Sequence, residues 1–109
     1  MLTIDEFKRG IMQFIDEVIA PKANSLMKFV IYFFVPAIPR MIDEYAQMLI
    51  EIDDDHDLIT TDGHINLDNV YKRAKGALEK AGSVAIPKLN YIIDMDDLEH
   101  LYKILLNMR

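Results

Sequence analysis

The segment that most constrains the fold is residues 25–35, which read SLMKFVIYFFV and carry a single charge, on Lys28. This run predicts a helix that is hydrophobic on every side, and such helices are normally buried on every side. A chain of 109 residues forms one domain with a modest core, which leaves little interior to surround such a helix. The helix is therefore the central element of the fold, one side of an intermolecular contact, or one wall of a groove for an apolar ligand or partner helix.

The function that this segment predicts is a non-catalytic protein-interaction or structural module that associates with itself. So much apolar surface in so small a chain favours burial against a copy of the chain or against another protein. The side chains expected to make the contact are Phe29, Tyr32, Phe33 and Val35. An ordinary core helix stays open as the simpler interpretation.

Four more helices are predicted by apolar residues at helical spacing. They cover residues 4–20, 39–52, 67–81 and 95–107. In the segment 39–52 one inward stripe is expected, formed by Ile38, Met41, Ile42, Tyr45, Met48, Leu49 and Ile52. Thr3 and Glu6 have the spacing of a capping box at the start of the first helix.

Prolines and short apolar runs predict the remaining organisation. Pro21 is expected to end or kink the first helix, and Pro36 and Pro39 to separate the second helix from the third. Two short strands, 84–86 and 90–93, predict a β-hairpin, which a strand near 64–66 could join. The predicted fold is α+β and helix-dominated, in a single domain with an all-helical half (1–52), an acidic loop (53–63) and a mixed half (64–109).

The acidic loop is the second candidate site, and its sequence from residue 53 is DDDHDLITTDGHINLD. Its DGHI stretch resembles the middle of an EF-hand calcium loop, but the flanking acids fall out of that register. A looser calcium or magnesium site could use the carboxylates of Asp53, Asp55, Asp57 and Asp62, and His56 and His64 could suit zinc or nickel. The simpler interpretation is a solvated loop that contains a tight turn, with no cofactor.

Charge and cysteine content restrict the partners and the compartment. The net charge of −6 argues against general nucleic-acid binding, which depends on basic surface. Four bases on one predicted helix face form either a solvated face or a patch for an acidic partner: Lys72, Arg73, Lys75 and Lys80. The absence of cysteine excludes disulfides and thiol chemistry and suits a reducing cytoplasm.

Segments for membrane insertion or export are not expected. The N-terminal MLTIDEFKRG has acids before any base, unlike a signal peptide. The longest uncharged apolar stretch, 29–39, would cross only about half of a bilayer core, which argues against a membrane-spanning helix.

Catalysis finds little support in the sequence. It contains no glycine-rich phosphate loop, no G-x-S-x-G elbow and no H-E-x-x-H motif. An enzyme of unknown class is therefore kept only as a further alternative. The small, motif-poor chain is of the style found in bacterial and prophage genomes.

Overall fold

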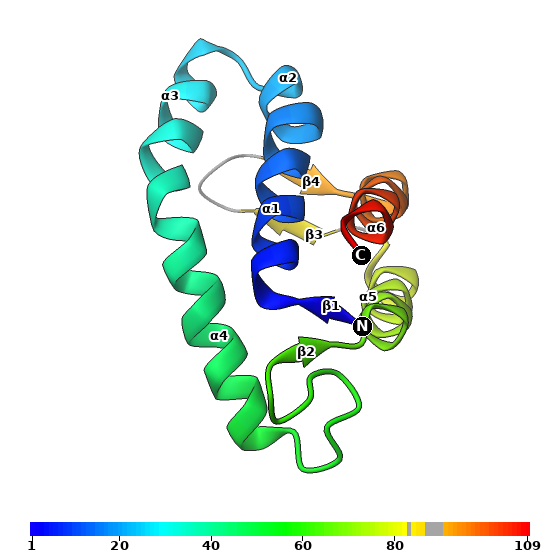
Figure 1. Cartoon of the computed structure of the whole chain (residues 1–109). Helices are drawn as coiled ribbons and strands as arrows, with labels where there is room; N and C mark the ends of the chain where they lie inside the picture. The colour runs from blue at the N-terminus through cyan, green and yellow to red at the C-terminus, as the bar shows by residue number, and fades with distance from the viewer. Residues whose placement is uncertain (83, 87–90) are drawn as a thin grey trace.

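The computed structural model describes residues 1–82, 84–86 and 91–109, and its fold is helix-dominated α+β as predicted (Figure 1). The elements are β1 (Leu2–Thr3), α1 (Ile4–Phe14), a π-helical turn (Ile15–Ile19), α2 (Ala20–Lys22), α3 (Ser25–Phe34), a 3₁₀ turn (Val35–Ala37), α4 (Ile38–Ile52), β2 (His64–Ile65), α5 (Leu67–Ala81), β3 (Val84–Ile86), β4 (Tyr91–Ile93) and α6 (Met95–Met108). Residue 90, where the second hairpin strand was predicted to begin, lies outside the described residues.

The predicted capping box is present at the start of α1. The Thr3 amide donates to Glu6 Oε1 at 2.8 Å, and the Glu6 amide donates to Thr3 Oγ1 at 3.1 Å. A second box begins α6, where Asp94 and Asp97 cap each other's backbone amides. These bonds satisfy amides that the first helical turn leaves without partners, so they fix where each helix begins.

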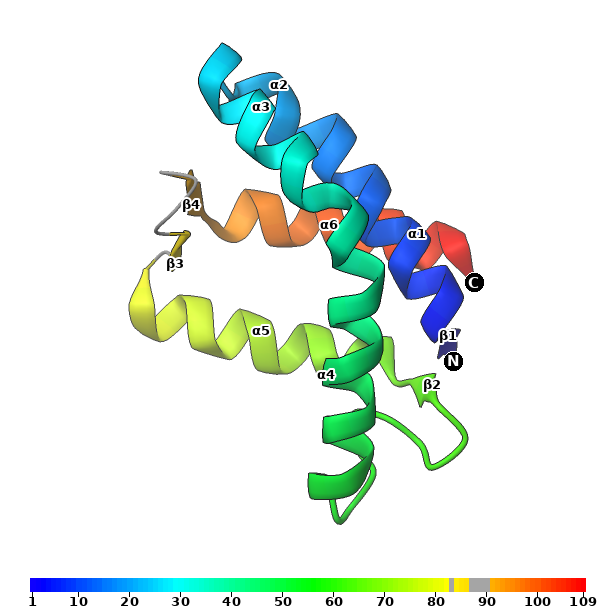
Figure 2. The same cartoon turned by 90° about the vertical axis from the view of Figure 1, so that its left-hand side faces the viewer.

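The prolines interrupt the regular α-helices close to the predicted places, but the helical path continues through them. The first helix continues through Pro21 to Lys22, and the π-helical turn before Pro21 lies where the missing proline amide interrupts regular bonding. Residues Ser25–Ile52 likewise form one helical rod of 28 residues. Pro36 lies in the first turn of the 3₁₀ segment and Pro39 in the first turn of α4. Proline is tolerated in a first turn because the N–H group that it lacks would have no partner within that helix. The rod bends at these prolines (Figure 2).

The strand at 64–65 pairs with the N-terminus and not with the hairpin. In this antiparallel pair Leu2 lies opposite Ile65, and Thr3 lies opposite His64. The predicted join with the hairpin was therefore wrong, because Leu2, which is fully buried, provides the apolar partner that β2 needs. The hairpin forms by itself, with Val84 opposite Ile93.

Helix α1 lies in the middle of the molecule, between the α3–α4 rod and the pair α5 and α6 (Figure 1). One core cluster joins its lower end to the loop, α4, α5 and α6, and includes Leu2, Ala46, Ile59, Ile65, Leu67 and Leu105. A second cluster surrounds its upper end and includes Phe14, Ile15, Val18, Ile19, Ile31 and Ile104. Both predicted halves thus contribute to a shared core.

Candidate interaction surface

The predicted contact residues of α3 lie mostly on the outside of the molecule. Phe29 is 70% exposed, Phe33 71% and Tyr32 53%. Val35 is half-buried and packs against the upper core cluster, and Ile31 is the only buried residue of α3. The simpler interpretation, an ordinary core helix, does not describe α3.

The exposed apolar surface continues over α4, which the sequence prediction missed. Of its predicted inward stripe, Ile38, Ile42 and Leu49 are half-buried, whereas Tyr45 is 59% and Ile52 65% exposed. The apolar arc of α4 is wider than the surface that α1 can cover, so one side of it faces inward and the other faces solvent. The spacing of 3.6 residues alone could not show where this division falls.

Exposed side chains of α3, the 3₁₀ turn and α4 recur every three or four residues, which makes each a neighbour of the next along the rod. We call them the outer stripe: Leu26, Phe29, Phe33, Ala37, Met41, Tyr45, Met48 and Ile52. Monomeric proteins seldom expose a continuous apolar surface of this length, and such surfaces mark binding sites.

The total surface area supports the same conclusion. The chain exposes 7089 Å², whereas a monomeric protein of 12.6 kDa is expected to expose about 6,200 Å². The excess of about 900 Å² is close to the roughly 800 Å² that each partner buries in a typical stable interface.

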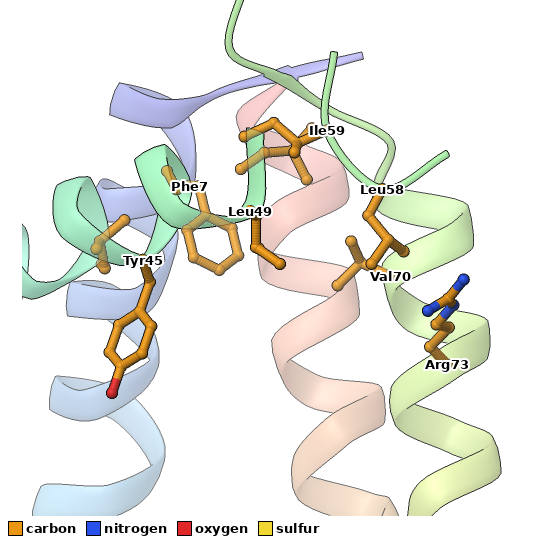
Figure 3. Close-up of a pocket in the computed structure, with 10 residues that line it drawn as sticks. Phe7, Tyr45, Leu49, Leu58, Ile59, Val70 and Arg73 are labelled. Carbon is orange, nitrogen blue, oxygen red and sulfur yellow. The ribbon is translucent and has the colours of Figure 1, made fainter. Parts of the chain in front are cut away.

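A pocket of about 320 Å³ opens beside the lower part of the outer stripe (Figure 3). It is lined by Phe7 of α1, Ile42, Tyr45, Ala46 and Leu49 of α4, Leu58, Ile59 and Ile65 of the loop and β2, and Val70 and Arg73 of α5. The polar side-chain groups are the Tyr45 hydroxyl and the Arg73 guanidinium, and Arg73 is paired with Asp57 at 3.0 Å. The pocket is therefore suited to an apolar group, and Tyr45 belongs both to it and to the outer stripe.

The rod Ser25–Ile52 is also long and apolar enough to cross a membrane, by length and composition alone. Only 6% of its most apolar window is buried, so it is not a core helix. The sequence prediction was based on residues 29–39 alone because they form the longest uncharged apolar stretch, between Lys28 and Arg40. The expectation that the chain does not span a membrane is therefore not confirmed.

Three of the four aspartates proposed for a cation already have partners within the chain. Asp53 accepts from the Leu58 amide at 3.1 Å, Asp57 pairs with Arg73, and Asp62 contacts the Thr60 hydroxyl and His64. Asp55 is exposed. Within residues 1–82, 84–86 and 91–109, no three His, Asp or Glu side chains come together as a metal site would require.

Hydrogen bonds to the loop carboxylates also favour their charged forms. The amide of Leu58 lowers the pKa of Asp53, and the hydroxyl of Thr60 lowers the pKa of Asp62. The same loop turns Ile59 into the core, where it is 2% exposed. The loop is thus an anchored structural element, and not merely a solvated connection.

The basic residues of α5 do not form a uniform patch. Arg73 is neutralised by Asp57, and the Lys75 amine lies 5.9 Å from the centre of the Tyr71 ring. Lys72 and Lys80 are exposed. This arrangement favours a solvated face over a docking site for an acidic partner.

Comparisons with protein-family models, with curated proteins and with solved structures found no match to this chain. The outer stripe and its pocket are accordingly interpreted from their own geometry and chemistry.

Proposed function

We propose that this chain is a protein-interaction module that associates with a second copy of itself through the outer stripe. The observation that carries the proposal is the exposure of large apolar side chains along the whole rod. Phe29, Phe33 and Ile52 are each at least 65% exposed. Burying one such side chain contributes roughly 1.5–3 kcal/mol, so several of them together can offset the cost of association.

A second copy is favoured over a lipid bilayer by the charges on the rod. The uncharged run 29–39 would extend only about 16 Å as a helix, against a bilayer core of about 30 Å. Arg40, Asp43, Glu44 and Glu51 follow within α4, and Asp43 is paired with Lys8 of α1 at 2.6 Å. The net charge of −6 also opposes attraction to an anionic lipid surface.

A protein interface can accommodate the same charges at its edge. Arg40 and Glu44 are exposed and pair with each other at 3.3 Å, beside the outer stripe and not within it. An apolar centre with a polar rim is the usual anatomy of protein–protein interfaces. We place this activity in the cytoplasm, in agreement with the cysteine-free composition.

The test compares absolute masses by light scattering at several concentrations. The unmodified chain should have twice the mass of one 12.6 kDa chain. Phe33→Glu should return the mass to that of one chain, because it places a charge within the stripe. Ala77→Glu adds the same charge at an exposed position of α5, away from the stripe, and should leave the dimer intact.

Two outcomes would contradict the proposal. One is an unmodified chain that stays monomeric at every concentration. The other is a Phe33→Glu variant that keeps its native circular dichroism and remains as dimeric as Ala77→Glu. A monomer that moves into phosphatidylcholine vesicles would identify lipid as the occupant of the stripe.

A further inference from the structure

The order of residues along the outer stripe contains information about how two copies pair. A dimer related by a two-fold axis uses the same surface of both subunits, so that surface must be complementary to itself. When the two rods run antiparallel, each stripe meets the other one reversed. The side chains of the two stripes can then meet along the whole length only if the spacing of residues is nearly the same when the stripe is followed in either direction.

The outer stripe has this property, with its centre at Pro39. Leu26 and Ile52 lie thirteen residues to either side of Pro39, and Phe33 and Tyr45 lie six residues to either side. Ala37 and Met41 lie two residues away. Phe29 and Met48 fall one residue out of this symmetry, which is within reach of their long side chains.

From this symmetry we propose that two copies pair through antiparallel α3–α4 rods, with the two-fold axis near Pro39. This inference rests on the proposed self-association and specifies its geometry. Ala37 lies next to the axis, where its small side chain lets the two rods approach closely. The aromatic half of each rod, α3, then covers the α4 half of the other.

The pocket beside α4 fits this arrangement. Phe33 of one copy lies opposite Tyr45 of the other, and Tyr45 forms part of the pocket edge (Figure 3). Phe33 is 71% exposed in the single chain, and it carries the large apolar surface that such a pocket can cover. Phe33 lies on the α3 half of the rod and the pocket lies beside the α4 half. Antiparallel pairing therefore brings Phe33 of each copy to the pocket of the other.

The lack of cysteine allows a direct test of direction. The variants Leu26→Cys and Ile52→Cys each introduce a single thiol at one end of the stripe. Antiparallel pairing predicts a disulfide-linked dimer when the two variants are mixed, allowed to exchange and oxidised. Neither variant should crosslink alone, because its two thiols would be about 39 Å apart.

The outcomes separate this inference from the proposed function. A dimer by light scattering whose single-cysteine variants each crosslink alone would overturn the antiparallel register and leave self-association standing. A monomer by light scattering would overturn both. Crosslinking only in the mixture, together with a dimeric mass, would establish both.

Discussion

The close crossing of α1 and α6 can be tested with one added methyl group. Gly10 is a buried position of α1, and a Cβ atom placed there would overlap Leu105 Cδ2 and lie 3.3 Å from Leu105 Cγ. Leu105 is 3% exposed and belongs to the lower core cluster. Gly10→Ala should therefore force the two helices apart or strain the Leu105 side chain.

The magnitude follows from comparison with Gly76→Ala on α5. A Cβ atom at Gly76 would have no neighbour within 4 Å. Both substitutions gain about 1 kcal/mol of helix propensity, so their difference isolates the packing cost at Gly10. Added methyl groups in packed cores cost about 1–3 kcal/mol, and Gly10→Ala should be less stable than Gly76→Ala by that amount.

The assay is thermal unfolding followed by circular dichroism at one fixed protein concentration, because self-association makes the melting temperature depend on concentration. The two variants should differ by about 4–8 °C for each kcal/mol. Gly76→Ala should melt at or above the temperature of the unmodified chain. If Gly10→Ala melts as high as Gly76→Ala, the close packing of α1 on Leu105 is refuted.

Three further predictions concern single side chains and ions. Asp97 is 2% exposed, accepts from the Asp94 amide at 3.3 Å and pairs with Lys22 at 3.1 Å. Asp97→Ala should lower the free energy of unfolding in urea by about 1–2 kcal/mol, whereas Asp96→Ala, at an exposed neighbouring position, should change it by less than about 0.5 kcal/mol. An equal effect of the two would contradict the capping and pairing role of Asp97. The Tyr71 hydroxyl donates to Glu99, which raises the pKa of Tyr71 from 10.0 to about 12. The unfolded chain thus loses this proton first, so the contribution of Tyr71 to stability should be constant below pH 10 and be lost between about pH 10 and 12. Tyr71→Phe should reduce that fall in melts recorded across this range, and an unaltered pH profile would count against the bond. Calcium or magnesium at millimolar concentration should leave the melting temperature unchanged, because Asp53, Asp57 and Asp62 already have partners within the chain. A bound ion at one hundred times its dissociation constant would add about 2.7 kcal/mol, and such a rise would revive the cation site.

Local sequence signals predicted the helices well, because their ends are determined by nearby residues. The capping pair Thr3 and Glu6 begins α1, and Gly82, with a φ of 77°, ends α5. These signals act within one turn and need no knowledge of the rest of the chain. Pro36 and Pro39 do separate α3 from α4 as predicted, but the sequence did not show that a 3₁₀ turn joins the two helices into one rod.

Long-range pairings were beyond the reach of such signals. Strands of two residues are too short to show an alternating pattern, so the sequence could not indicate that Leu2 pairs with Ile65. Nor could it indicate that Ile59, within an acidic loop, is buried in the core. Excess apolar character drew attention to α3, where Phe29, Tyr32 and Phe33 prove to be exposed. Their extension along α4 through Met41, Tyr45 and Met48 became visible only once the position of α1 showed which side of the rod is covered.

The central claim is that the outer stripe is covered by a second copy of the chain, and the mass of the unmodified protein in detergent-free buffer tests it most directly. Sedimentation equilibrium over a wide concentration range should show a species of twice 12.6 kDa that dissociates on dilution. A single species of 12.6 kDa at every concentration would contradict the claim and leave the stripe to another occupant.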